Sequence, residues 1–400
     1  MRIVIVQYGD FGDAYRRLQA GGAETYRDQR HTVDFVASLA PGHEVTTVAI
    51  CDREHDEELG PGLRSIGISS EAGWDRGQMR PLLDRLAPEA LICRTPIPAV
   101  LGWAADRQVL TLPSFADIFT NVNLRERLRN WRLARAIRRC VWPCVANHSL
   151  SASLSLARLG LRPEEIVPWD HCRIIPARET KTAPPPFRPF RLFFAGELSE
   201  TKGVGDCIEA VAIAHQAGAA VELVLAGKGD AGKWAELARR RGIEDLVRLL
   251  GVIPAEQVIA EMRESDAVVV SSRHDHQEGL PNTIFEAMAS RSPLIASDHP
   301  AFVERLRPEV DSLRYRAADP RDLACQVQRL IREPDLYERL SDASPEALAG
   351  LYVGVEWSEM VALFLADPLN AGGWVRPLSL AALDKSGSPR GRLAPQQRGA

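Results

Sequence analysis

The stretch from 267 to 297 constrains the fold of this chain more than any other, because it is typical of a strand, a glycine turn, a helix and a second strand in succession. The run Ala267–Val270 is short and β-branched, which predicts a strand buried on both faces of a parallel sheet. Gly279 and Pro281 suit a turn, and Asn282 is a good N-cap for the helix that follows. That helix would begin at the carboxyl end of a strand, where open α/β sheets bind ligands and free N–H groups suit a phosphate.

The string EGLPNTIFEAMASRSPLIAS at 278–297 resembles the donor-site signature of the retaining, nucleotide-sugar-dependent glycosyltransferases of family 4, which have the two-domain GT-B fold. The resemblance implies that Glu278 contacts the transferred sugar and that Glu286 contacts the ribose hydroxyls. Outside this motif, either glutamate would be typical of a solvated surface, and Glu286 is favoured near a helix N-terminus by the dipole alone. The resemblance implies that the turn formed by Gly279, Leu280, Pro281 and Asn282 binds the donor, and that its backbone amides hold the distal phosphate. Pro281 cannot take part in this way, because it has no N–H.

Two more strand ends in the second half of the chain match the same family. The strand RLFFAG ends at Gly196 and leads to Lys202, the position at which the family lysine holds the donor diphosphate; the alternative is a solvated loop lysine. The strand VELVLAG ends at Gly227 and is followed by Gly229. Both glycines allow the backbone to approach a nucleotide closely, although glycines after a strand are common in α/β domains.

Glu197 departs from the family pattern, because the family usually has an arginine at this position. A carboxylate that faces a diphosphate would repel it by on the order of a few kcal/mol in a partly desolvated cleft. Either Glu197 turns away from the donor, or a neighbouring arginine such as Arg273 substitutes for the missing charge.

The first half of the chain begins with an aliphatic strand at 2–7, which leads into a glycine-bearing loop at 8–22. Gly21 and Gly22 are expected to start a helix that ends at Pro41–Gly42. The GGAE turn resembles the opening of the family, in which paired glycines let the backbone approach donor and acceptor; two adjacent glycines are otherwise a turn signal. Further strands are expected at 43–50, 63–68, 89–93, 108–112 and 141–147, with helices near 76–86, 97–105, 121–139 and 150–159.

Pro113 and Ser114 stand where many family members carry a histidine that positions the sugar or acceptor. Asp117 is the nearest polar candidate for a substitute, although an aspartate near a helix start is more often a cap. His148 precedes the helix at 150–159, and a lone histidine there is more often satisfied by local contacts than catalytic.

The resemblance covers roughly residues 1–366 and implies an α/β fold class, with two Rossmann-like domains that face each other across a cleft and a C-terminal helix that crosses back to the N-terminal domain. The proline-rich run TKTAPPPFRP predicts the linker between the domains. The expected organisation is an acceptor-side domain at 1–179, the linker at 180–189, a nucleotide-sugar-binding domain at 190–345, the crossing helix at 346–369 and a disordered tail at 370–400.

Composition excludes several classes of protein. Four hundred residues suit two α/β domains, and a net charge of −4 does not indicate a nucleic-acid partner. The seven cysteines form no CxxC pair, which argues against a zinc site or a disulfide framework. The chain opens with a strand and has no apolar run of spanning length, so we expect a cytoplasmic protein without a signal peptide.

We expect a donor site that holds neither a metal nor a bound cofactor. The sequence has no DxD motif, and consecutive His274, Asp275 and His276 would point to alternating sides of an extended chain rather than converge on an ion. The charge of the leaving group would then be met by Lys202, backbone amides and the helix dipole. The resemblance implies retention at the anomeric carbon, with the leaving phosphate oxygen accepting the acceptor proton on the same face.

The leading hypothesis is a retaining glycosyltransferase that moves a sugar from a nucleotide-sugar donor to a glycan or lipid-linked glycan, in exopolysaccharide or cell-surface glycan synthesis. One alternative is a nucleotide-sugar epimerase or a phosphorylase on the same fold. A second is a catalytically silent binding protein of that fold, an idea motivated by Glu197 and Pro113.

The segment LRERLRNWRLARAIRR at 124–139 has seven arginines against one glutamate. Helical periodicity puts Leu133, Ile137, Cys140 and Val141 on one inward arc, and the arginines fill the opposite arc together with Leu124, Leu128 and Trp131. Basic and large apolar side chains together suit an anionic lipid surface, so we expect a peripheral membrane contact. The alternative is a solvated helix face on which Trp131 packs against a neighbouring loop.

Overall fold

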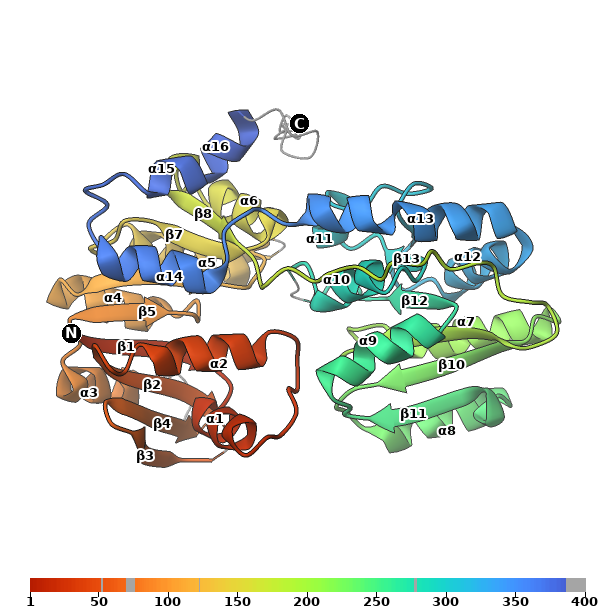
Figure 1. Ribbon diagram of the computed structural model, residues 1–400, viewed down its shortest axis with the longest axis horizontal. Coiled ribbons are helices and arrows are strands. Elements are labelled where there is room, and N and C mark those ends of the chain that lie inside the picture. Colours follow the sequence, from red (N-terminus) through yellow and green to blue (C-terminus); the bar gives the residue numbers. More distant parts are fainter. Residues whose placement is uncertain (52, 70–75, 122, 277–278, 386–400) are drawn as a thin grey trace. The chain divides into compact units, whose positions relative to one another are not determined.

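The computed structural model describes the chain except for residues 52, 70–75, 122, 277–278 and 386–400 (Figure 1). The chain divides into two compact units. Unit 1 contains Met1–Ala23, Asp28–Cys172 and the chain from Val353 onward, and unit 2 contains Glu24–Arg27 and Arg173–Tyr352.

Unit 1 is built on an eight-stranded sheet in the order β3-β4-β2-β1-β5-β6-β7-β8, in which β3 alone among the described strands runs antiparallel to its neighbour. Alternate residues of its central strand enter the cores on opposite faces: Val4 and Val6 pack on one side, and Ile3 and Ile5 on the other. The strands are β1 (Arg2–Tyr8), β2 (Glu44–Cys51), β3 (His55–Gly60), β4 (Leu63–Ser69), β5 (Ala90–Cys93), β6 (Leu110–Phe115), β7 (Val145–His148) and β8 (Ile166–Trp169).

Helices cover both faces of this sheet (Figure 1). They are α1 (Phe11–Gln19), α2 (Gln29–Ser38), α3 (Arg76–Leu86), α4 (Pro98–Arg107), α5 (Leu124–Ile137), α6 (Leu150–Arg158), α14 (Trp357–Ala366), α15 (Val375–Leu378) and α16 (Leu380–Lys385), with a short 3-10 helix at Pro163–Glu165. The late helix α14 adds Trp357, Met360 and Phe364 to the core that contains Ile3 and Ile5. The last described helices therefore belong to the same unit as the first strand.

Unit 2 is built on a six-stranded parallel sheet in the order β11-β10-β9-β12-β13-β14. The strands are β9 (Phe190–Ala195), β10 (Val221–Ala226), β11 (Val247–Gly251), β12 (Ala267–Val270), β13 (Leu294–Ser297) and β14 (Leu313–Tyr315). The helices are α7 (Val204–Gln216), α8 (Ala231–Arg241), α9 (Ala255–Glu264), α10 (Asn282–Ala289), α11 (Pro300–Val303), α12 (Pro320–Arg332) and α13 (Pro334–Leu351), with a 3-10 helix at Glu244–Leu246. The strand order reverses between β9 and β12, and this doubly wound arrangement binds ligands at the carboxyl ends of the strands beside the reversal.

The opening of unit 1 differs from the prediction, because the expected loop at 8–22 contains helix α1. Asp10 caps this helix by accepting a hydrogen bond from the Asp13 N–H at 2.9 Å, and Phe11 and Leu18 become buried. Gly21 and Gly22 therefore follow α1 instead of starting the next helix, which begins at Gln29. Strands β3 and β8 were not predicted, since the polar sequence HDEELG and the short IVPW give weak periodic signals.

The end of the chain also differs from the prediction. The segment 346–366 is divided between two helices: α13 ends at Leu351 in unit 2, and α14 starts at Trp357 in unit 1. The expected disordered tail from 370 contains α15 and α16, and it buries Val375 and Leu380 against unit 1. Trp374, Leu378 and Leu383 of this segment are partly buried against the same unit, so a few apolar contacts hold it in place.

Candidate active site

A pocket of about 440 Å³ opens in unit 2 where β9 and β10 end. It lies at the sheet edge where parallel α/β sheets bind ligands. Its lining combines small backbone-rich residues, apolar side chains and a few charged groups. These residues are Thr25, Tyr26, Arg27, Ala195, Gly196, Ala226, Gly227, Lys228, Val252, Ile253, Ala255, Val258, Asn282, Thr283 and Glu286.

Two of the predicted glycines, Gly196 and Gly227, line this pocket. Gly227 has φ +146°, and a Cβ at this position would lie 1.7 Å from the carbonyl oxygen of Gly196. The Gly196 N–H donates to the carbonyl of Ala226 at 2.9 Å, which holds the two turns together. Gly229 has φ +155° and faces Leu198 in the same way, with a Cβ site 2.6 Å from the Leu198 oxygen. These glycines are therefore required for the close approach of two turns, whatever they bind.

Helix α10 begins one residue earlier than predicted, because Pro281 is the N-cap and Asn282 is the first helical residue. Glu286 lies one turn into this helix and is 5 % exposed. Burial raises the pKa of Glu286 to about 7, and the positive charge of Arg27 opposes that rise. The pocket therefore contains a carboxyl group whose charge changes close to neutral pH.

Arg27 is the residue of this pocket that the sequence did not reveal. Its Nη2 donates to Oδ1 of Asn282 at 3.1 Å, and its guanidinium carbon lies 5.7 Å from the ring centroid of Phe285. The side chain is buried at 9 % exposure. Arg27 and Asn282 are separated by 255 positions, so no local sequence signal could have paired them.

Lys202 lies in the turn between β9 and α7. Its carbonyl oxygen accepts a hydrogen bond from the Ser271 hydroxyl at 2.7 Å, and its side chain is partly exposed. The next residue, Gly203, has φ +74°, with a Cβ site only 2.2 Å from the Ser271 oxygen. Backbone contacts thus fix this turn. Neither Lys202 nor the exposed Glu197 at the start of the turn is among the residues that line the pocket.

Arg273 does not lie in the pocket. Its guanidinium forms a two-pronged ion pair with Asp206, at 2.6 and 2.8 Å, and also reaches Glu200 at 3.4 Å. These carboxylates raise the pKa of Arg273. Arg273 is therefore bound to Asp206 of α7 and does not supply positive charge to the pocket.

The first glutamate of the motif, Glu278, lies outside the described residues. Its neighbours in the turn are described: Gly279 is partly exposed and Leu280 is buried at 2 % exposure. Upstream, His274 contacts Asp298 at 2.7 Å, whereas His276 contacts the Thr201 hydroxyl at 3.0 Å. The two histidines have separate partners, and they lie in a turn rather than in the extended chain that the sequence suggested.

Asp117 lies in unit 1, in the segment that links β6 to α5. Burial raises the pKa of its carboxyl, and the charge of Arg129 opposes this rise. It is not a helix cap, since Asn123 caps α5 by accepting from the Glu126 N–H at 2.9 Å. Ser114, which stands at the position of the family histidine, accepts a hydrogen bond from the Trp357 indole at 3.0 Å.

His148 is buried at the end of β7, with its ring 4.8 Å from that of His171 and 4.0 Å from the carboxylate of Asp170. His171 in turn contacts Asp28 at 2.9 Å. Asp28 follows the point where the chain leaves unit 2, and His171 precedes the point where it enters unit 2 again. Sequence reasoning missed this cluster. Its contact between Asp28 and His171 joins two segments of unit 1 that lie next to the unit's boundaries in the chain.

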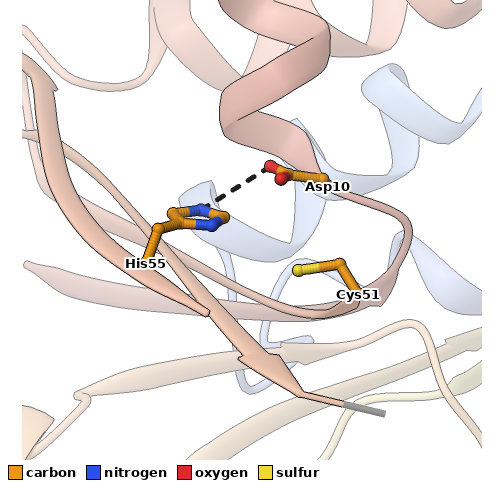
Figure 2. Close-up of side chains that lie close together, drawn as sticks. All are labelled: Asp10, Cys51 and His55. Carbon is orange, nitrogen blue, oxygen red and sulfur yellow. Dashed lines mark ion pairs between the residues drawn. The ribbon is translucent and has the colours of Figure 1, made fainter. Parts of the chain in front are cut away.

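Among the described residues of unit 1, two sets of side chains could hold a metal ion by the proximity of their ligand atoms. The first is Asp10, Cys51 and His55, which Figure 2 shows converging at the ends of β1 and β2. Each member has a protein partner: Asp10 caps α1, the Cys51 thiol donates to the Arg53 carbonyl, and His55 contacts the Ser65 hydroxyl at 3.1 Å. These hydrogen bonds are sufficient to explain why the three side chains lie together, because each one stabilises a neighbouring turn or strand.

The second set contains Asp28, His31 and Cys172. Asp28 is engaged by His171, and the carboxylates of Asp28 and Glu356 beside Cys172 raise the pKa of its thiol in addition to the effect of burial. A thiol held in its protonated form is a poor metal ligand. All seven cysteines are described and none forms a disulfide.

The family model described as glycosyl transferases group 1 matches residues 189–333. The amylovoran biosynthesis glycosyltransferase AmsK of Erwinia amylovora is 28 % identical over 181 residues, which are 44 % of this chain and 42 % of that protein. The lipopolysaccharide core biosynthesis glycosyltransferase LpsD of Rhizobium meliloti is 26 % identical over 278 residues, 58 % of this chain and 78 % of that protein. The match thus spans less than half the length of the first of these curated relatives.

Solved structures extend the likeness to the whole fold. Anabaena Alr3699/HepE in complex with UDP has a TM-score of 0.63 at 15 % identity, covering 92 % of this chain and 100 % of that one. Sucrose-phosphate synthase from Thermosynechococcus elongatus has a TM-score of 0.66 at 17 % identity, covering 93 % and 100 %. The chain therefore has the GT-B fold of two Rossmann-like domains, and its residues 189–333 match the family model of the glycosyl transferases group 1.

Proposed function

We propose that this protein is a glycosyltransferase that transfers a sugar from a nucleotide-sugar donor to a glycan or lipid-linked glycan acceptor, in exopolysaccharide or cell-surface glycan synthesis. The observation that carries the proposal is the pocket of unit 2, which combines the buried Glu286, the N-terminus of α10 and the glycine turns at the strand reversal. The names of the curated relatives support the reaction and its setting in polysaccharide synthesis. The UDP complex of a structural neighbour supports the class of donor.

The chemistry proposed for this pocket assigns a role to each group. Glu286 accepts hydrogen bonds from the ribose hydroxyls, and the amides at the start of α10 bind the distal phosphate. Lys202 stabilises the charge of the leaving diphosphate, and Glu278 contacts the transferred sugar. We propose retention at the anomeric carbon without a metal ion, because the leaving phosphate oxygen accepts the acceptor proton and no protein base is then needed at Pro113 or Ser114.

The experiment that tests the proposal is incubation with UDP-glucose, GDP-mannose and ADP-glucose, in EDTA, followed by proton NMR. A glycosyltransferase releases the nucleoside diphosphate and transfers or hydrolyses the sugar, whose first-formed anomer keeps the α configuration of the donor. An isomerised donor would identify an epimerase instead. Binding without any turnover would identify a silent protein of the same fold, for which the departure at Glu197 gives a physical motive.

We also propose that helix α5 contacts an anionic membrane surface. The helix has the predicted orientation, with Leu133 and Ile137 at 1 % and 0 % exposure. On its outer face Leu124, Leu128 and Trp131 are 80, 47 and 58 % exposed. The guanidinium carbon of Arg135 lies over the Trp131 ring, 5.9 Å from its centroid. Within the described residues, no helix is long and apolar enough to cross a membrane. An amphipathic basic face is suited to binding at the headgroup layer.

The protein is expected to sediment with phosphatidylglycerol vesicles at low salt and not with phosphatidylcholine vesicles, because arginines near an anionic surface each contribute about 1 kcal/mol. Changing Arg125, Arg129 and Arg132 to glutamate should abolish sedimentation. The matched control is the same change at 239–241, three exposed arginines of α8 in unit 2. An equal loss of sedimentation in the control variant would show that only the net charge of the protein matters. Equal binding to phosphatidylglycerol and phosphatidylcholine vesicles would contradict the proposal.

A further inference from the structure

The pocket of unit 2 is lined by two cationic side chains, those of Arg27 and Lys228. Family members carry an arginine at the position of Glu197, but Glu197 is exposed and does not line the pocket. The neighbouring Arg273 is bound to Asp206 at 2.6 Å. A donor diphosphate carries two negative charges, so a pocket that lacks the usual arginine needs another source of positive charge.

We propose that Arg27 takes over the role of the arginine that family members carry at position 197, and that its guanidinium binds the diphosphate of the donor. The inference rests on the proposed function, because it names a further donor-binding residue in the same pocket. Arg27 lies within the first 30 residues of the chain, yet it belongs to unit 2 and lines the pocket of that unit.

The backbone around Arg27 is anchored at both ends. The carbonyl oxygen of Glu24 accepts a hydrogen bond from the Ala255 N–H at 3.1 Å, which joins the segment Glu24–Arg27 to the start of α9 in unit 2. On the other side, Asp28 adopts φ +72° and contacts His171 at 2.9 Å within unit 1. A non-glycine residue in this backbone region is uncommon and needs support from its surroundings. The position of Arg27 is thus fixed by contacts that its own side chain does not make.

The guanidinium lies where the anion of a donor would be held. Its hydrogen bond to Asn282 places it on the first residue of α10, beside the positive end of the helix dipole. The Phe285 ring lies 5.7 Å from the guanidinium carbon and supports it. A guanidinium has five N–H donors in a planar fork, a geometry that matches the oxygens of a phosphate.

Arg27 also acts on Glu286, and the test must separate the two effects. The charge of Arg27 lowers the pKa of Glu286, which burial raises to about 7. Removing the charge would raise this pKa further and weaken ribose binding near neutral pH, without any contact between Arg27 and phosphate. At pH 9, well above the pKa of about 7, Glu286 of the wild type is ionised. Nucleoside binding by the variant at this pH reports any loss that acts through Glu286, and a larger loss for the diphosphate reports on the phosphates.

The experiment measures binding at pH 9 of UDP, GDP and ADP by calorimetry and of the matching nucleosides by saturation-transfer NMR. For the base that the wild type binds, Arg27→Met should weaken diphosphate binding by about ten- to a hundredfold, the range expected for hydrogen bonds to a charged group. Nucleoside binding should be unchanged, and Arg27→Lys should restore part of the diphosphate affinity. The matched control is Arg173→Met, which removes an arginine of unit 2 that lies over Tyr352 instead.

Each outcome decides the inference. Unchanged diphosphate binding in Arg27→Met would overturn it. Equal loss of diphosphate and nucleoside binding would also overturn it and would assign Arg27 to the support of Glu286 or of the pocket walls. A wild type that binds none of the three diphosphates would overturn the proposed function itself, and this inference with it.

Discussion

Lys202→Ala is expected to lower the turnover number by about ten- to a thousandfold, because the variant loses a positive charge that stabilises the leaving diphosphate in the transition state. Stability should change little: the turn is held by the backbone, through the bond from Ser271 to the Lys202 carbonyl and through Gly203. Initial rates at saturating nucleotide sugar, with EDTA present, give the comparison.

Lys233 offers the matched control for this charge. It is an exposed lysine of α8 that pairs with Glu200 at 3.1 Å, and it lies outside the turn between β9 and α7. Lys233→Ala should keep the wild-type turnover number. Wild-type turnover in Lys202→Ala would remove the lysine from the mechanism, and complete loss of wild-type activity in EDTA would contradict a metal-independent reaction.

Gly227→Ala is expected to destabilise the fold by on the order of 4 kcal/mol, at the upper end of the range for single substitutions. The new Cβ would lie 1.7 Å from the Gly196 oxygen, which is backbone and cannot swing aside as a side chain can. The φ of +146° is itself unfavourable for alanine. The two turns would have to separate, so nucleotide binding should be lost with stability. Urea midpoints followed by circular dichroism report the change.

Gly242→Ala isolates the backbone contribution to that loss. Gly242 has φ +69°, but no atom lies within 4 Å of the Cβ site. We expect this control to cost about 1 kcal/mol, the usual price of an alanine in the left-handed region. Similar midpoints for the two variants would show that the Gly196 and Gly227 turns are not held as closely as the geometry requires.

The parts of the fold that the sequence predicts are those that depend on local periodicity. The apolar runs at β1, β9, β10 and β12 indicate buried parallel strands, because both faces of such strands are covered. The helix α1 was missed because the polar residues Asp13, Arg16 and Arg17 interrupt its buried ones. Its amphipathic face is visible only at helical spacing, and the neighbouring glycines mask it.

The candidate site was predictable where it is contiguous in the chain. The motif at 278–297 led to Glu286 and α10, and Gly196 and Gly227, which directly follow β9 and β10, line the pocket. Arg27 could not be predicted, because its partners Asn282 and Phe285 are more than 250 positions away. The pairing of Arg273 with Asp206 depends likewise on the packing of β12 beside α7 and not on any local pattern.

The central claim, that the pocket around Glu286 binds the nucleoside part of a donor through an ionised carboxylate, is tested most directly by the pH dependence of nucleotide-sugar binding. The pKa of Glu286 is raised to about 7 in the fold, from an ordinary value near 4.5, so folding disfavours the carboxylate and the free protein loses stability as pH rises from 4.5 to 7. A donor that requires the carboxylate should therefore bind more tightly as pH rises from 6 to 8. Nucleotide sugars suit this measurement because their phosphodiester charges do not change in that range.

Calorimetry with the nucleotide sugar that raises the melting temperature should give an affinity that increases with a midpoint near pH 7 in the wild type. Glu286→Gln should bind more weakly, with a profile that is flat over the same range, and should be more stable than the wild type at pH 8 because it avoids a buried charge. A flat wild-type profile, or a sloping one that Glu286→Gln retains, would contradict the assignment of Glu286 to the donor.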